Sequence, residues 1–240
     1  MKVYECCMLI LVVFLHVVYG ETWAVVVSTS RYWFNYRHAA NALSIYSLLR
    51  ELNVPDSNII LMNSVNIACD SRNSIQGAIY NSHLSHHDLC SNGLETDYEG
   101  DDVNLQNFLN VLTGRHEPSL PKHKRLLSTN ESQILVFMSG HGGDEFLKFH
   151  DTEELTAMMV RDTFQEMHVK QRYKEILFIV DTCQASTLGN YIDESTPNVI
   201  FVGSSLQGEN SYGYGMHQEL GVSLVDRFSY GIFEYFRKQL

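Results

Sequence analysis

Two residues of the chain, His141 and Cys183, have the side chains that thiol-based acyl transfer requires. His141 lies in the glycine-rich segment Ser139–Gly143, and Cys183 follows Asp181 and Thr182. A cysteine thiol becomes a strong nucleophile when a neighbouring imidazole accepts its proton. Taken singly, each has a simpler interpretation, because turn histidines are often structural and isolated cysteines are commonly buried apolar residues. The role of Asp181 is left open.

Both residues come directly after short apolar segments that predict buried strands. Ile134–Met138 precedes the histidine, and Ile176–Val180 precedes the cysteine. Apolar runs of this kind are typical of parallel sheets, and the chemistry of open α/β sheets lies beyond the carboxyl ends of the strands. A helix expected over Leu155–Tyr173 would connect the two as parallel neighbours. We therefore expect His141 and Cys183 at the same edge of one sheet.

The remaining sequence predicts an α/β fold with a mainly parallel central sheet. Further strands are expected at Trp23–Val27, Asn58–Met62 and Asn198–Val202, and helices at Tyr36–Leu52, Val103–Leu112 and Leu220–Lys238. Residues 63–102 and 115–131 lack periodicity and predict long loops. Asn35 lies between the first strand and the first helix, where an asparagine either caps the helix or points into the site.

The glycines beside His141 suggest a further functional group. The Gly142 N–H is not shielded by a side chain, so it is a candidate donor to a developing oxyanion. A phosphate-binding loop is the alternative, but neither the Walker pattern nor G-x-G-x-x-G is present.

Charge and hydropathy limit the class and compartment of the protein. The chain has 240 residues and a formal net charge of −11, which disfavours nucleic-acid binding because phosphate contacts need a basic surface. Residues 1–20 are expected to be a secretory signal peptide, with an apolar Met8–Val18 and a cleavage site before Glu21. An uncleaved membrane anchor is the alternative. Residues 21–240 then form one domain.

Three cysteines follow the expected signal peptide. An odd number in an oxidising compartment implies at least one unpaired thiol, and Cys183 is the best candidate. Cys69 and Cys90 could pair with each other, or one of them with a partner chain. Asn130 begins an Asn-Glu-Ser sequon, so a glycan is an open alternative there.

Several segments together resemble the family of GPI-transamidase catalytic subunits. This family is part of the C13 group of cysteine peptidases, which includes legumain and is more distantly related to caspases. The matching segments are Ser30–His38, Val54–Ser57, Phe108–Arg115, Lys124–Ser128, Ser139–Gly143, Phe146–Phe149, Asp181–Gln184 and Val225–Phe228. Trp33–Asn35 and Phe146–Phe149 look more like the transamidase branch than legumain. The resemblance implies a caspase-like three-layer sandwich.

The resemblance also implies roles for individual residues. Cys183 would be the nucleophile and His141 its base. Asn35 matches a third catalytic residue beside the histidine, and Gly142 would supply the oxyanion N–H. No cofactor is expected for catalysis.

A substrate pocket and a partner contact are expected outside these catalytic residues. Ser204 and Ser205, just after the predicted strand Asn198–Val202, would line the substrate-binding pocket. Cys69 matches a family cysteine that forms a disulfide with another subunit, whereas Cys90 has no counterpart in the family pattern.

A structural calcium ion is the one metal that the resemblance implies. The matching positions are Asp56, the Ile59 carbonyl, Glu95 and Asp97. Five carboxylates lie within Glu95–Asp102, and such oxygen ligands suit Ca²⁺. Without the resemblance, a solvated acidic loop is favoured because EF-hand spacing is absent.

The nearby histidines suggest a second metal, which the spacing does not support. His83, His86 and His87 are zinc-type ligands. They lack the fixed Cys/His spacing of structural zinc sites, so we favour a solvated loop.

The expected activity is transamidation. Cys183 would cleave a C-terminal GPI-attachment signal through a thioester, and the new C-terminus would pass to the ethanolamine amine of a GPI anchor. Expected partners are the other transamidase subunits, the proprotein signal and the GPI glycolipid. The expected place is the endoplasmic reticulum lumen, with membrane association through the complex.

Two alternatives remain open. One is a legumain-like asparaginyl endopeptidase with water as acceptor, because the catalytic motifs alone do not separate transfer from hydrolysis. The other is a non-catalytic subunit, since family members usually continue beyond the last predicted helix, often to a transmembrane segment that these 240 residues do not include.

Overall fold

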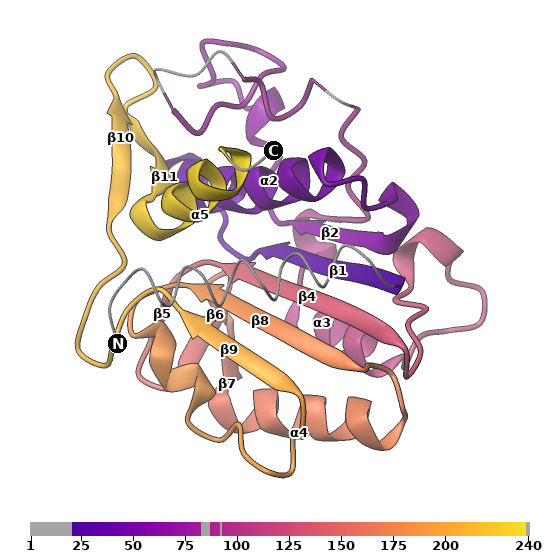
Figure 1. Cartoon of the computed structure of the whole chain (residues 1–240). Coiled ribbons are helices and arrows are strands. Elements are labelled where there is room, and N and C mark those ends of the chain that lie inside the picture. The colour runs from indigo at the N-terminus through magenta and orange to yellow at the C-terminus, as the bar shows by residue number, and fades with distance from the viewer. Residues whose placement is uncertain (1–20, 83–86, 92, 239–240) are drawn as a thin grey trace.

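A six-stranded sheet between two layers of helices forms the centre of the molecule (Figure 1). In this computed structural model the described residues are 21–82, 87–91 and 93–238. The strands of the sheet are β1 (Glu21–Ser28), β2 (Ile59–Asn63), β3 (Tyr98–Glu99), β4 (Ser132–Ser139), β8 (Glu175–Asp181) and β9 (Val199–Gly203). The expected signal peptide lies outside the described residues.

All neighbouring strands in this sheet are parallel, in the order β3-β2-β1-β4-β8-β9. The five strands predicted from apolar runs therefore all belong to one sheet, with ends within two residues of those expected. β4 and β8 are neighbours, which confirms the predicted pairing of the histidine and cysteine strands.

Helices cover both faces of the sheet and create two apolar cores. Helices α2 (Tyr36–Glu51) and α5 (Arg227–Arg237) lie on one face, and α3 (Leu105–Thr113) and α4 (Ala157–Val169) lie on the other (Figure 1). Side chains of a strand alternate between faces, so Ala24 and Val26 pack in the first core and Val25 and Val27 in the second. The fold is the expected caspase-like α/β sandwich.

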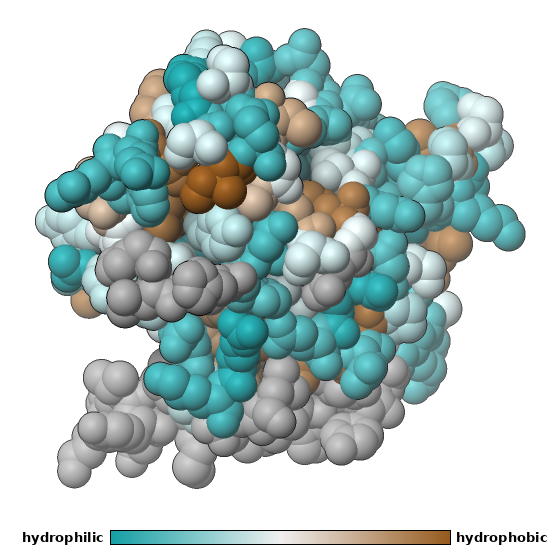
Figure 2. Space-filling view, turned by 90° about the horizontal axis from the view of Figure 1, so that it is seen from above, coloured by the Kyte–Doolittle hydropathy of each residue, from teal (hydrophilic) through white to brown (hydrophobic). Residues whose placement is uncertain are grey.

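Short 3₁₀ turns connect several of these elements. They span Trp33–Asn35, Asp56–Asn58, Ile67–Cys69, Gly100–Asp102, Lys122–Lys124 and Ala185–Gly189. Among the described residues no helix has the length and apolarity needed to cross a membrane. Seen from above, the surface is mainly polar, with small separate apolar areas (Figure 2).

Two small antiparallel sheets correct the predicted helix boundaries. Strands β5 (Gly142–Gly143), β6 (Phe146–Phe149) and β7 (Glu153–Thr156) form one, and β10 (Gly213–His217) and β11 (Val222–Asp226) form the other. The predictions that helices begin at Leu155 and Leu220 were wrong, because Leu155 lies in β7 and Leu220 lies in the turn that leads into β11. The apolar residues of these two segments fit the alternation of a strand as well as the spacing of a helix. Pairing with a neighbouring strand decided between the two.

Helix α5 contains a glycine that weakens it. A Cβ added to Gly231 would meet no atom within 4 Å, and the backbone there is not left-handed. Glycine in a helix interior loses more backbone entropy than alanine, so Gly231→Ala should raise the free energy of unfolding by about 0.5–1 kcal/mol. Urea denaturation of both proteins would measure this, and an unchanged or lower value would contradict it.

Candidate catalytic site

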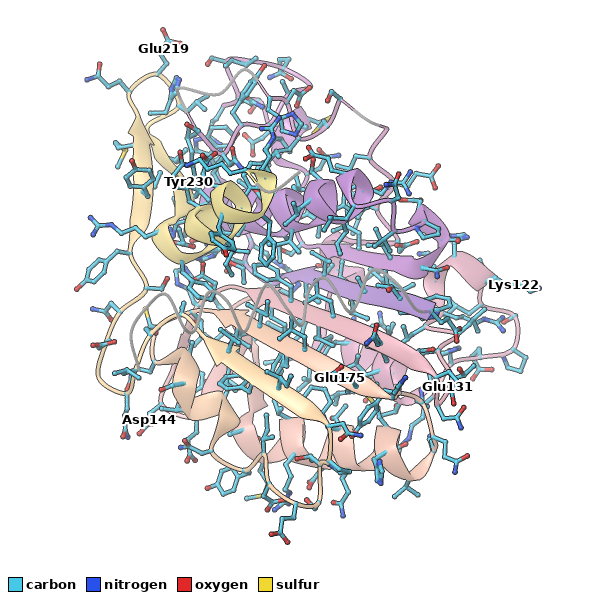
Figure 3. The ribbon with its side chains drawn as sticks, in the orientation of Figure 1. Lys122, Glu131, Asp144, Glu175, Glu219 and Tyr230 are labelled. Carbon is cyan, nitrogen blue, oxygen red and sulfur yellow. The ribbon has the colours of Figure 1, made fainter. Side chains whose placement is uncertain are left out.

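Three adjacent strand ends carry the candidate catalytic residues. Ser139 of β4 is in register with Ser28 of β1 and with Asp181 of β8. Just beyond the strands, the Gly140 N–H donates to the Asp181 carbonyl (3.3 Å). His141 and Cys183 each follow two residues after their strand. In Figure 3, Asp144 marks this end of the sheet, opposite Glu131 and Glu175 at the other end.

Asn35 directly contacts His141. Its Oδ1 lies 2.8 Å from His141 Nε2, and its Nδ2 donates to the Arg31 carbonyl (2.7 Å). Asn35 occupies the N-cap position of α2, but its side chain makes no capping hydrogen bond. Of the two interpretations of Asn35, the structure therefore supports the side chain that points into the site.

The asparagine defines the protonation of the imidazole. An amide oxygen can only accept, so Nε2 of His141 carries the hydrogen and Nδ1 has a free lone pair. Burial, and secondarily the charge of Arg37, lowers the pKa of His141. The ring is therefore neutral at pH 7 and able to accept a proton, as a general base requires.

Cys183 is a free, half-buried thiol in a tight loop. The next residue, Gln184, is left-handed (φ 54°), and a five-residue 3₁₀ turn follows it. Cys183 therefore leads into a 3₁₀ turn and not into an α-helix. Gln184 is held on both sides, because its N–H donates to the Glu209 carbonyl and its Oε1 accepts from the Gly208 N–H, each at 2.9 Å.

Gly142 occupies a position that tolerates no side chain. An added Cβ would lie 2.5 Å from Thr182 Oγ1 and 2.6 Å from the Phe146 carbonyl oxygen. Gly142 also pairs with Leu147 in the small β5–β6 ladder. The fold thus fixes the peptide that follows His141 against the loop of the nucleophile.

The two predicted pocket serines bind the nucleophile loop. Ser204 Oγ accepts from the Thr182 N–H (3.2 Å) and donates to the Thr182 carbonyl (3.1 Å). Ser205 Oγ donates to the same carbonyl (2.7 Å) and accepts from the Ala185 N–H (3.1 Å), so it bridges the residues on either side of Cys183. Both hydroxyls have protein partners here, and their contact with a substrate stays a prediction.

A buried polar network lies behind the histidine, and the sequence analysis did not identify it. Asp226 accepts from Arg37 Nε (3.0 Å) and from Asn41 Nδ2 (2.6 Å). His38 lies between this carboxylate and the site, 3.8 Å from Asp226 Oδ2 and edge-on to His141 with ring centroids 4.8 Å apart. Burial holds the pKa of His38 well below its usual value, so it is neutral.

Asp181, for which the sequence defines no role, belongs to the same buried polar network. Its carboxylate accepts from Ser211 Oγ (2.6 Å) and from both the N–H (3.2 Å) and Oγ (2.6 Å) of Ser229. Several residues of this network lie in two segments that match the family, Ser30–His38 and Val225–Phe228. A sequence, however, does not show which charged residues contact one another.

Asp226 makes the stability of the fold sensitive to pH. Burial, and next the negative charge of Asp181, raises the pKa of Asp226 to about 7. The folded state therefore holds this proton more tightly than the unfolded chain, and the associated stability is lost as pH rises through about 7. We expect the Tm of wild type to fall from pH 5 to pH 8 more steeply than that of Asp226→Asn.

Thermal unfolding across this pH range measures the effect. Asp162→Asn, at an exposed position of α4, is a control that should keep the wild-type slope. An Asp226→Asn slope equal to that of wild type would contradict the assignment.

The expected calcium ligands are partly brought together. Asp97 Oδ2 accepts from the Leu61 N–H (2.8 Å), and Tyr46 donates to Asp56 Oδ1 (2.5 Å). Burial is the main cause that raises the pKa of Asp97 to about 6, and the negative charge of Asp56 adds to it. Two acidic side chains that repel each other fit a site for a hard cation, although Arg50 Nε also lies 3.9 Å from Asp56.

A complete metal site is not defined among the described residues. Among the residues that the structure describes, no group of three or more His, Cys, Asp and Glu side chains has the arrangement of a metal site. Two of the histidines considered for zinc, His83 and His86, lie outside those residues. Calcium binding through Asp56, Ile59, Glu95 and Asp97 therefore stays a prediction.

Cys69 and Cys90 are both free thiols in this chain. Cys69 is exposed, which is compatible with a disulfide to another subunit. Cys90 is half-buried, and burial, followed by Asp88 and Cys69, raises its pKa to about 12. Cys90 is therefore a poor nucleophile.

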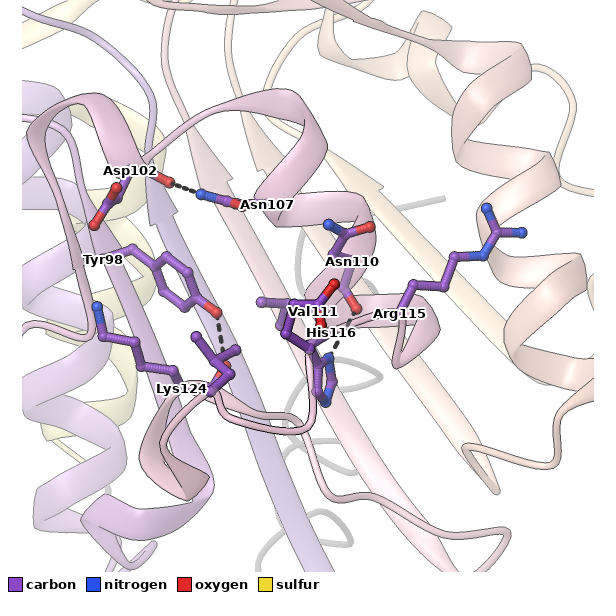
Figure 4. A pocket seen from close by; sticks show the side chains of 10 residues that line it. Tyr98, Asp102, Asn107, Asn110, Val111, Arg115, His116 and Lys124 are labelled. Carbon is purple, nitrogen blue, oxygen red and sulfur yellow. Dashed lines mark hydrogen bonds between the residues drawn. The ribbon is translucent and has the colours of Figure 1, made fainter.

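A cavity of about 410 Å³ beside α3 lies away from the candidate catalytic residues (Figure 4). Its lining includes Tyr98, which donates to the Lys124 carbonyl, and Asn107, which donates to the Asp102 carbonyl. None of the candidate catalytic residues lines it, so this cavity does not mark the candidate catalytic site.

Comparison with known proteins agrees with the fold and the motifs. The chain is 48% identical to GPI-anchor transamidase of Saccharomyces cerevisiae, over 88% of this chain and 51% of the relative. It is 43% identical to the proteins of that name from Schizosaccharomyces pombe (92% and 57%) and Homo sapiens (90% and 54%). The chain thus spans between half and two-thirds of the length of these relatives.

A family model gives the same result over nearly the whole described chain. The model of the Peptidase C13 family matches residues 22–239, which include all three strand ends and the loops that follow them. The chain therefore belongs to the Peptidase C13 family.

Proposed function

We propose that the chain is a cysteine-dependent transamidase that attaches GPI anchors, with Cys183 as nucleophile. The carrying observation is the contact of Asn35 with His141, at a sheet edge where the neighbouring strand leads into Cys183. The choice of reaction is supported by relatives named GPI-anchor transamidase, of which this chain covers between half and two-thirds.

The first half of the reaction forms a thioester. Cys183 Sγ attacks a carbonyl carbon of the proprotein while its proton passes to His141 Nδ1. The Gly142 N–H donates to the oxyanion. The carbon–nitrogen bond then breaks, His141 returns the proton to the leaving amine, and the C-terminal signal departs.

The second half transfers the acyl group. The ethanolamine amine of the GPI glycolipid attacks the thioester and loses a proton to His141. The carbon–sulfur bond breaks, and Cys183 regains the proton as a thiol. Asn35 keeps the Nε2–H tautomer throughout, so that Nδ1 remains the atom that exchanges protons.

A hydroxylamine assay separates transfer from hydrolysis. The full chain is incubated with a peptide that carries a GPI-attachment signal and with increasing hydroxylamine. We expect a hydroxamate whose yield rises with hydroxylamine while the signal peptide is released. Acid product alone at saturating hydroxylamine would overturn transamidation and favour the legumain-like endopeptidase.

The proposed setting follows from the substrates. Both the proprotein signal and the GPI glycolipid are membrane-associated, so the chain would act in the endoplasmic reticulum lumen with other transamidase subunits. Ser204 and Ser205 would line the pocket for the small residue at the attachment site. Cys69, which is exposed, would form the disulfide to a partner subunit.

We further propose that Asp56, the Ile59 carbonyl, Glu95 and Asp97 hold a structural calcium ion. Bound Ca²⁺ would neutralise the buried charge of Asp97, whose pKa of about 6 makes the metal-free fold lose stability as pH rises through 6. Millimolar CaCl₂ should therefore raise Tm at pH 7.5 by a few degrees, on the order expected for ligand concentrations well above Kd.

Asp97→Asn provides the matched test. An asparagine oxygen can still accept from the Leu61 N–H, so the variant removes the charge while keeping that hydrogen bond. We expect its Tm not to respond to CaCl₂ when compared with EGTA, with MgCl₂ as control. A calcium shift equal to that of wild type would overturn the ligand assignment.

A further inference from the structure

Thr182 belongs to the loop of the candidate nucleophile, and its side chain packs against the loop of the candidate base. It directly precedes Cys183, and its side chain faces Gly142, which directly follows His141. A Cβ on Gly142 would lie 2.5 Å from Thr182 Oγ1 and 3.1 Å from Thr182 Cγ2. Both branches of the side chain therefore pack at the α-carbon of Gly142, one residue away from each candidate catalytic side chain.

The backbone of Thr182 is held firmly from the other side. Its N–H and carbonyl are bound by Ser204 Oγ, and its carbonyl also accepts from Ser205 Oγ. A β-branched side chain on a fixed backbone has little freedom about χ1. The side chain is thus a rigid spacer between the serines that follow β9 and the loop of Gly142.

The hydroxyl of Thr182 is buried and has no hydrogen-bond partner within the described part of the chain. The whole residue is only 1% exposed, so a substrate atom does not reach Oγ1 in this conformation. A buried hydroxyl without a partner destabilises a fold. The side chain must therefore act through its shape and not by donating to the substrate.

We propose that Thr182 is a positioning residue that sets the distance and direction between Cys183 and the His141–Gly142 peptide. The proposal rests on the proposed function, because it takes Cys183 as the atom that accepts the acyl group. Loss of the spacer would let the Gly142 N–H drift from the oxyanion position. A misplacement of about 1 Å near the reacting atoms can lower the rate about 100-fold.

Three variants of the full chain separate shape from hydrogen bonding. Thr182→Val keeps both branches and loses the hydroxyl, Thr182→Ser keeps the hydroxyl and loses the methyl, and Thr182→Ala loses both. We expect Thr182→Ala to lower kcat for thioester formation about 10- to 100-fold with unchanged KM, and Thr182→Ser to lower it as well. Thr182→Val should stay within about twofold of wild type.

The valine substitution should increase the thermal stability of the protein. Because it removes an unpartnered buried hydroxyl, Thr182→Val should raise Tm by about 2–4 °C while activity is kept. Wild-type kcat in Thr182→Ala would overturn the proposal, as would a folded Thr182→Val that loses as much activity as Thr182→Ala. If Thr182→Ala does not fold, the proposal requires Thr182→Ser to be slower than Thr182→Val.

The rate of Cys183 alkylation can be measured without an acyl acceptor, so it tests this proposal separately from the proposed function. Alkylation of Cys183 by iodoacetamide, resolved from Cys69 by peptide mass spectrometry, reports the base–thiol geometry directly. Thr182→Ala should be alkylated at Cys183 more slowly than wild type and Thr182→Val at the wild-type rate; equal rates for all three would overturn the proposal. Acid product alone from wild type at saturating hydroxylamine would refute transamidation and leave this series valid, because hydrolysis uses the same thioester.

Discussion

Cys183→Ala is expected to abolish thioester chemistry, lowering release of the signal peptide and hydroxamate formation by at least about 10⁴-fold. The reason is that the substitution removes the atom that forms the covalent bond, while His141 and Asn35 keep their 2.8 Å contact. Chromatographic quantification of both products from the full chain would measure the effect.

Cys90→Ala is the matched control. Cys90 is also a half-buried free thiol, but its pKa is raised to about 12 and it lies outside the strand ends of the site. Its removal should leave the rate near that of wild type. If Cys183→Ala retained wild-type processing in cells that lack the endogenous enzyme, the nucleophile would be assigned wrongly and the non-catalytic alternative would be favoured.

Gly142→Ala is expected to lower kcat about 10²- to 10³-fold, the usual effect of losing one oxyanion donor. The added methyl would lie 2.6 Å from the Phe146 carbonyl oxygen, which is backbone and cannot rotate away. The peptide after His141 must then shift, and its N–H leaves the position in which it donates to the oxyanion. Steady-state kinetics with a signal peptide would show a loss in kcat larger than any change in KM.

Gly231→Ala is the control for adding a methyl group. Gly231 has open space around the added Cβ and lies in α5, so this variant should keep wild-type kcat and gain stability. A folded Gly142→Ala with wild-type kcat would show that the Gly142 N–H takes no part in the reaction.

Most of the central sheet could be predicted from the sequence. The strands are buried on both faces, so apolar residues occupy nearly every position, as in Ile134–Met138. Other short elements do not require such continuous apolar segments. The same argument predicted His141 and Cys183 at one sheet edge, since parallel neighbours must end on the same side. The small sheets were missed because β7 and β11 are short, and their apolar residues also fit a helical spacing.

The interior behind the site could not be predicted. Asp226 is the last residue of β11, and Arg37 and Asn41 lie on α2, far away along the chain. Sequence patterns report the period of an element and its burial, but they carry no information on which polar side chains meet across two packed elements. The raised pKa of Asp226 depends wholly on that packing.

The sequence by itself determined the parallel sheet, the chemical types of the reacting residues and their common edge, because these follow from hydrophobic periodicity and chain direction. Only the tertiary structure decided what Asn35 does. Its side chain leaves the helix N-terminus uncapped and orients His141 instead, which depends on a contact between residues 106 positions apart. Tertiary packing likewise decided that Thr182 touches Gly142, because long-range contacts arise only when the loops of separate strands are brought to one edge.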